Sequence, residues 1–170
     1  DLTSSTVDVA IAAGEAIGDL LIDMKEKALG AADSSLTSNQ RSAFNEDFKA
    51  LRDQVATVIS NAEFNGVNLI NNSTASVEAF ADSDGGSVIT VLDENLSLGG
   101  AIVTLAATAS LDTVTNSSAA VGTIETSLTN LNQALARLST ASKALGIHSD
   151  FVTKLSDVTE KGIGNLVDAD

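Results

Sequence analysis

Three stretches of the chain repeat apolar residues with the period of an α-helix. In residues 7–31, 44–62 and 118–161, apolar or small residues recur in alternating steps of three and four. This heptad spacing is typical of helices that pack along a single seam. The pattern therefore predicts three long helices, with seam positions that include Ile17, Leu21, Met24, Phe44, Phe48, Leu51, Val55, Leu128, Leu131, Leu135 and Leu138.

The boundary between the first two helices is marked by local signals. Thr37 followed by Gln40 reads as a capping box, in which each side chain satisfies a backbone donor of the other residue. The polar connection at 30–36 is short, and short connections make consecutive helices antiparallel neighbours. The third helix would be too long to cover its own apolar stripe, so it must lie against both earlier helices or against another chain.

Between the second and third helices the apolar period changes to about two. Asn65-Gly66 predicts a tight turn, and the β-branched runs 87–92 and 101–105 predict strands, with 76–80 as a weaker third. The expected fold is mainly α: an elongated antiparallel bundle of three long helices with a small β-hairpin element between helices two and three. It forms one domain, 1–170, divided into N-terminal helices and turn (1–70), β element (71–116) and C-terminal helix (117–170).

The composition fits a slender helical rod. There is no proline to interrupt the helices, and without Trp, Tyr or Cys the core must be aliphatic apart from five Phe. The net charge of −14 argues against nucleic acid as a partner and against binding to an anionic membrane surface. No apolar run approaches the roughly 20 residues of a membrane span.

Candidate chemistry is sparse. His148 is the single histidine and has no cysteine to share a metal, so we interpret it as a surface or interface residue. The Asp-rich segment 82–86 lacks the spacing of a calcium loop and is expected to be a solvated turn. Asp93 and Glu94 are adjacent on a predicted strand end, where their side chains would point to opposite faces. We therefore predict no enzyme activity, no metal and no cofactor.

Several segments resemble bacterial flagellins of the alpha-proteobacterial type. Residues 62–70, which contain Glu63, Phe64, Asn65 and Gly66, resemble the TxFNGxxLL signature that follows the second flagellin helix. Residues 20–28 resemble the L-Q-R-M-R-E-L-A segment of the first long helix. Residues 134–156 are similar to the long C-terminal helix, and residues 95–100 to alpha-proteobacterial members.

The resemblance implies a D1 domain, with the terminal D0 helices and the larger outer domains absent from this chain. It implies an extracellular structural subunit that, when full length, polymerises with other flagellin subunits into the filament used for swimming. The flagellar export apparatus and a chaperone would be partners through the missing termini. Two alternatives stay open, a hook–filament junction protein and a flagellin-like cell-surface binding protein, although the lack of Trp and Tyr disfavours the second.

One segment departs from the family pattern. Flagellins sensed by the animal flagellin-binding Toll-like receptor carry Gln-Arg-x-Arg-Glu-Leu in the first long helix. At the corresponding positions this chain has Ile22, Asp23, Met24, Lys25, Glu26 and Lys27. Replacing an arginine fork by an acid reverses the charge at a recognition anchor. We therefore predict weak or absent activation of the receptor.

Overall fold

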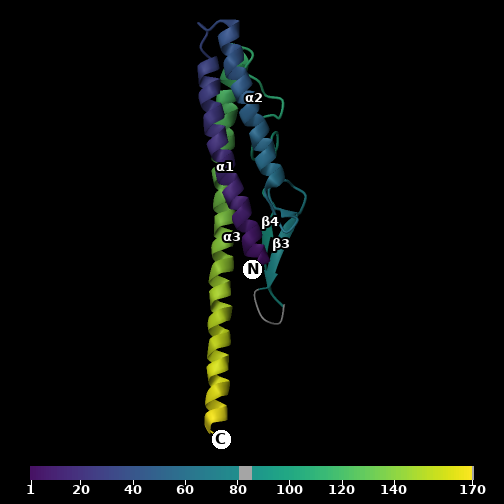
Figure 1. The fold of residues 1–170 in the computed structure, drawn as a ribbon, viewed down its shortest axis with the longest axis vertical. Helices are drawn as coiled ribbons and strands as arrows, with labels where there is room; N and C mark the ends of the chain where they lie inside the picture. The colour runs from purple at the N-terminus through teal and green to yellow at the C-terminus, as the bar shows by residue number, and fades with distance from the viewer. Residues whose placement is uncertain (81–85, 170) are drawn as a thin grey trace.

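The computed structural model describes residues 1–80 and 86–169 and is an elongated helical rod (Figure 1). Its helices are α1 (Leu2–Ala31), α2 (Ser38–Asn61) and α3 (Val114–Ala169). α1 runs antiparallel to both α2 and α3, and a small β region lies beside the rod between α2 and α3 in sequence. The predicted fold class is therefore confirmed.

The turn between α1 and α2 follows the predicted capping box. The backbone N–H of Gln40 donates to Thr37 Oγ1 at 3.2 Å, and the N–H of Thr37 donates to Gln40 Oε1 at 2.9 Å. Arg41 closes the other side, because its guanidinium donates to the carbonyl oxygens of Ala31 and Asp33 at 3.0 and 2.9 Å. The end of one helix and the start of the next are thus satisfied by the same short connection.

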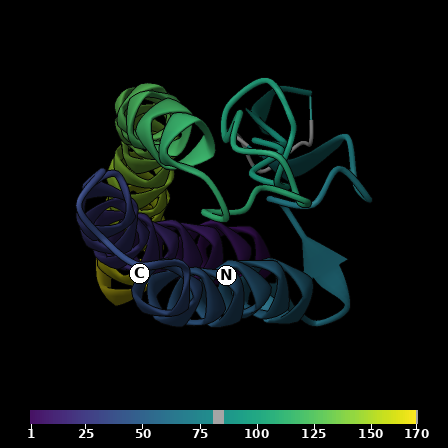
Figure 2. The same cartoon turned by 90° about the horizontal axis from the view of Figure 1, so that it is seen from above.

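α3 is longer than the sequence predicted, with 56 residues instead of the stretch 118–161. It packs mainly along α1, so of the two predicted arrangements, on both earlier helices or on another chain, the first holds for α1 and not for α2. The space between α2 and α3 is taken by residues 93–113, whose loops lie beside both helices in the view from above (Figure 2). Arg52 on α2 donates to the carbonyl of Ala109 at 2.6 Å, and the Leu111 N–H donates to Asn45 at 2.7 Å.

Two antiparallel hairpins form the β region. β1 (Glu63–Phe64) pairs with β2 (Val67–Asn68), and β3 (Ser76–Phe80) pairs with β4 (Val88–Leu92). The strands predicted at 76–80 and 87–92 are therefore confirmed. The Asp-rich turn predicted at 82–86 falls almost entirely in residues 81–85, outside the described residues.

The strand predicted at 101–105 is wrong. Val103 and Leu105 are buried, as the apolar pattern suggested, but the backbone forms bends rather than a strand. The N–H groups of Thr104 and Leu105 donate to the Ser127 hydroxyl on α3 at 3.0 and 3.3 Å. The Leu105 carbonyl accepts from the Gly99 N–H at 2.8 Å. Because these partners satisfy the backbone, the segment needs no neighbouring strand.

Candidate assembly surface

The seam residues of the three helices lie inside the chain. Fully or nearly fully buried are Ile17, Leu21, Met24, Phe48, Val55, Leu131 and Leu138, and half-buried against them are Phe44, Leu51, Leu128 and Leu135. Periodicity had left open whether this seam faces the same chain or another one. In the structure it packs one helix of the chain on another and leaves other faces of the rod for partners.

Glycines of α1 let this helix approach both α3 and α2 closely. A Cβ built on Gly14 would come within 2.4 Å of the Leu135 Cδ2 atom, and one on Gly30 within 2.7 Å of the Phe44 ring. Each glycine therefore receives a large side chain from the facing helix. Only a rearrangement of that side chain would accommodate an alanine.

The family turn motif forms the β1–β2 hairpin directly after α2. Asn65 and Gly66 have φ values of 53° and 81°, and two successive positive φ angles define the turn type that matches the twist of a tight hairpin. Asn68, buried behind the turn, donates from Nδ2 to the Ile59 carbonyl at 2.7 Å and accepts from the Ile70 N–H at 2.9 Å. The motif thus ends α2 and fixes the direction of the chain into the β region.

The receptor-recognition-like segment lies on α1 with its basic side chains already paired. Lys25 Nζ is 3.2 Å from Glu125 on α3, and Lys27 Nζ is 3.2 Å from Asp47 on α2. Ile22, Asp23 and Glu26 are exposed. A partner approaching this face would therefore meet carboxylates and an apolar side chain rather than free cations.

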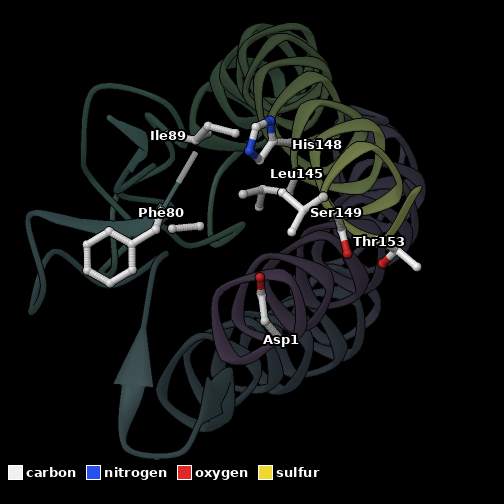
Figure 3. A pocket seen from close by; sticks show the side chains of 9 residues that line it. Asp1, Phe80, Ile89, Leu145, His148, Ser149 and Thr153 are labelled. Atoms are coloured by element: carbon white, nitrogen blue, oxygen red, sulfur yellow. The ribbon is translucent and has the colours of Figure 1, made fainter. Parts of the chain in front are cut away.

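His148 lines a cavity of about 180 Å³ between α3, the β3–β4 hairpin and the start of α1 (Figure 3). Its neighbours there include Ile89 and Leu145, and its ring centroid is 6.2 Å from that of Phe151. The Nε2 atom is buried without a hydrogen-bond partner among the described residues. Asp1, Ser149 and Thr153 also line the cavity, but the described residues place no third metal-ligating side chain with His148 and Asp1.

Asp93 and Glu94 follow the end of β4 and contact different groups. Glu94 accepts two hydrogen bonds from Arg137, at 2.6 Å from Nε and 3.0 Å from Nη2, and so holds the segment after β4 on α3. Burial raises the pKa of Asp93 to about 6, although its hydrogen bond from the Asn72 N–H works in the opposite direction. The charge of Glu94 adds to the rise.

Across residues 1–80 and 86–169, no cluster of three or more His, Cys, Asp or Glu side chains is placed to hold a metal ion. None of the helices in that part of the chain has both the length and the apolar character of a membrane span.

The structure also shows exposed apolar residues that the seam pattern did not single out. On α1 these are Ile22 and Leu29, which are 49% and 54% exposed. On α3 every residue from 151 to 162 is exposed, among them Phe151, Leu155 and Val158. The sequence carried a signal for them, since the residues on α3 continue the apolar pattern of that helix.

Comparisons with known proteins agree with this architecture. Residues 1–75 match the family described as the bacterial flagellin N-terminal helical region. Flagellin FljM of Caulobacter vibrioides is 47% identical over 98% of this chain, and flagellin FljO of the same organism is 46% identical over the same share. The chain belongs to the bacterial flagellin family.

The fold of a crystallised relative points the same way. The crystal structure of Bacillus cereus flagellin superposes with a TM-score of 0.76 at 16% identity, covering 88% of this chain and 85% of that one. At that identity the match shows a shared fold. The chain spans 60% of the length of each of the two Caulobacter flagellins, so what a whole flagellin does comes to this chain as a proposal.

Proposed function

We propose that this chain is a structural subunit of the bacterial flagellar filament, polymerising outside the cell for swimming motility. One observation carries the proposal: nearly the whole chain, folded as a rod in which α1 packs on both α2 and α3, aligns with flagellins of Caulobacter vibrioides at 46–47% identity (Figure 1).

The names of the relatives support the same function, since they are flagellins over nearly the whole length of this chain. The flagellar export apparatus and its chaperone are the further partners that this proposal entails. A structural role also agrees with the residues themselves. Glu94 accepts two hydrogen bonds from Arg137, which hold the segment after β4 on α3.

The two alternatives predict a different place on the cell. A hook–filament junction protein would occupy only the base of the filament, and a cell-surface binding protein would lie on the cell body. A binding protein for carbohydrate would also present exposed aromatic platforms, and this chain has neither Trp nor Tyr.

Immunogold electron microscopy of the source bacterium, with antibody raised against this chain, tests the three functions directly. Label along the whole filament supports the proposal. Label restricted to the hook end shows a junction protein, and label on the cell body shows a surface-binding protein; either result overturns the proposal. A strain that lacks the gene supplies the control, because it should lose all label.

A further inference from the structure

The turn between β1 and β2 contains the two groups that react with each other when an asparagine loses its side-chain amide. The electrophile is the amide carbon Cγ of Asn65, and the nucleophile is the backbone nitrogen of the next residue, Gly66. Gly66 has no Cβ that could hinder the attack, so this pair of residues is chemically suited to the reaction. Whether the reaction occurs then depends on the conformation in which the fold holds the pair.

The folded turn keeps the two groups apart. Asn65 has a φ of 53°, in the left-handed region, where the Cβ of a residue lies close to its own carbonyl oxygen. The nitrogen of Gly66 is bonded to the same carbonyl carbon on the side opposite to that oxygen, so it points away from the Asn65 side chain. Ring closure needs the reverse arrangement, in which this nitrogen eclipses Cβ. The reaction therefore requires a large rotation about the Cα–C bond of Asn65.

The closed hairpin prevents this rotation. Phe64 pairs with Val67, so Asn65 and Gly66 must bridge two paired strand residues, and they do so with positive φ angles at both positions. Directly after the turn, the side chain of Asn68 is buried and bonded to the backbone of Ile59 and Ile70. If Asn65 left the left-handed region, the turn would be lost and these contacts would break.

The chain after the hairpin adds a second anchor. The carbonyl oxygens of Leu69 and Ile70 accept hydrogen bonds from the N–H groups of Glu94 and Leu96, both at 2.8 Å. Leu69, Ile70 and Leu96 are fully buried. Because the residues on that side of the turn are fixed, strain in the turn cannot be relieved by a shift of β2, and only opening of the hairpin frees Asn65.

We propose that Asn65 is a site of spontaneous deamidation that the closed β1–β2 hairpin protects and that reacts when the hairpin opens. After the Gly66 N–H loses its proton to hydroxide, the nitrogen attacks Cγ of Asn65. The bond from Cγ to the side-chain nitrogen breaks, and ammonia leaves with a proton taken from water. Water then opens the cyclic imide at one of its two carbonyl carbons.

The two products differ in their effect on the fold. Opening on the main-chain side of the imide nitrogen leads to isoaspartate, and opening on the side-chain side leads to aspartate. Aspartate suits a turn with positive φ, so the hairpin can close again. Isoaspartate puts an additional carbon into the main chain between Phe64 and Gly66, and the two-residue turn that aligns Phe64 with Val67 is lost. Opening of the hairpin thus marks a fraction of the chains irreversibly.

Asn72-Ser73 provides a comparison within the same chain. Asn72 also has a positive φ, of 65°, but the nucleophile there would be the Ser73 nitrogen, whose N–H donates to Asn71 Oδ1 at 3.0 Å. Ser73 also has a side chain that hinders the attack. In the unfolded chain Asn65 should therefore react faster than Asn72.

Peptide mapping by mass spectrometry tests the protection. The chain is kept in mildly alkaline buffer, with or without enough urea to unfold it, and a peptide of residues 61–70 in both solutions measures the effect of urea on the chemistry. Relative to that peptide, Asn65 should convert at least about tenfold more slowly in the folded chain than in the unfolded chain. Equal rates in the two states, or faster conversion at Asn72 than at Asn65 in urea, would overturn the proposal.

A variant that loosens the hairpin tests the gating. Asn68→Ala removes the two hydrogen bonds behind the turn, so conversion at Asn65 in buffer should rise about fivefold. Ser60→Ala, at an exposed hydroxyl that donates to the Ala56 carbonyl, is the control and should leave the rate unchanged. Circular dichroism verifies that both variants are folded, and an unchanged rate in folded Asn68→Ala contradicts the gating.

If Asn68→Ala does not fold, the wild type at urea concentrations below its unfolding transition replaces it. Conversion at Asn65 must then rise in parallel with hydrogen exchange of the Val67 N–H, and a rate that ignores this exchange contradicts the gating equally. After refolding, chains with aspartate at position 65 should exchange at Val67 as the Asn65→Asp variant does, and chains with isoaspartate should exchange faster. Protection of the isoaspartate chains equal to that of the wild type would refute the account of the products.

Discussion

Replacing Ser127 by alanine removes the acceptor that holds the segment 101–105 against α3. The buried hydroxyl accepts hydrogen bonds from the N–H groups of Thr104 and Leu105 and donates to the Thr123 carbonyl at 2.8 Å. Among the described residues, the N–H groups of Thr104 and Leu105 have no other hydrogen-bond acceptor. The substitution therefore leaves the Leu105 N–H unsatisfied in a buried place.

The expected cost follows from these contacts. Losing the two hydrogen bonds and leaving a buried donor unpaired costs about 2 kcal/mol. Because alanine is a better helix former than serine, the substitution also stabilises α3 by about 0.5 kcal/mol. The free energy of unfolding should fall by about 1.5 kcal/mol in total, which lowers the melting temperature by roughly 3–6 °C for a chain of this size.

Urea denaturation followed by circular dichroism measures this change, and amide hydrogen exchange at residues 104 and 105 locates it. Thr129→Ala is the matched control on the same helix: Thr129 is exposed and its hydroxyl donates only to the Glu125 carbonyl. The control should be unchanged or about 0.5 kcal/mol more stable. A Ser127→Ala variant as stable as the control, with unchanged exchange at 104 and 105, would refute the account of this segment.

Three further predictions test other parts of the structure. Burial raises the pKa of Asp93 to about 6, so the folded state holds its proton more tightly than the unfolded state. The tighter proton binding stabilises the folded state at low pH, and this stabilisation is lost as the pH rises from about 4 to 6. The Asp93→Asn variant should therefore have a free energy of unfolding about 1 kcal/mol higher than the wild type at pH 7.5 and little different at pH 3.5. Urea denaturation at both pH values measures the difference. In the same assay, Gly66→Ala should lower the free energy of unfolding by about 1 kcal/mol, because φ is 81° at this position. The control Gly122→Ala, in an exposed part of α3, should raise it by about as much. In a receptor reporter assay, the full-length parent should activate the animal flagellin-binding receptor weakly, and full activation would contradict the assigned role of Asp23.

The helical part of this fold was predictable because its cause is local. The heptad steps and the Thr37–Gln40 capping box need only residues close in sequence, and both appear as predicted. The Asn65-Gly66 turn was predictable for the same reason, since positive φ angles suit these two residues.

The segment 101–105 shows where the sequence was insufficient. Its β-branched residues and flanking glycines fit a strand, but the polar partner of its backbone is Ser127, more than 20 residues later. Ser127 interrupts an otherwise apolar seam, and nothing in the sequence indicates that its hydroxyl accepts hydrogen bonds from a distant loop. A high strand propensity means that the side chains pack well on a half-buried surface, which need not be a neighbouring strand. For residues 101–105 that surface is helix α3.

The rotation of α1 about its own axis could not be predicted from the sequence. A heptad pattern gives the face that a helix buries, and every other face of the same helix repeats with the same spacing. The direction in which the remaining faces point depends on how α1 sits between α2 and α3, which the Lys25–Glu125 and Lys27–Asp47 pairs mark. With that rotation known, Ile22 and Leu29 face outward from α1, although both are large apolar residues that the sequence alone would have placed in a core.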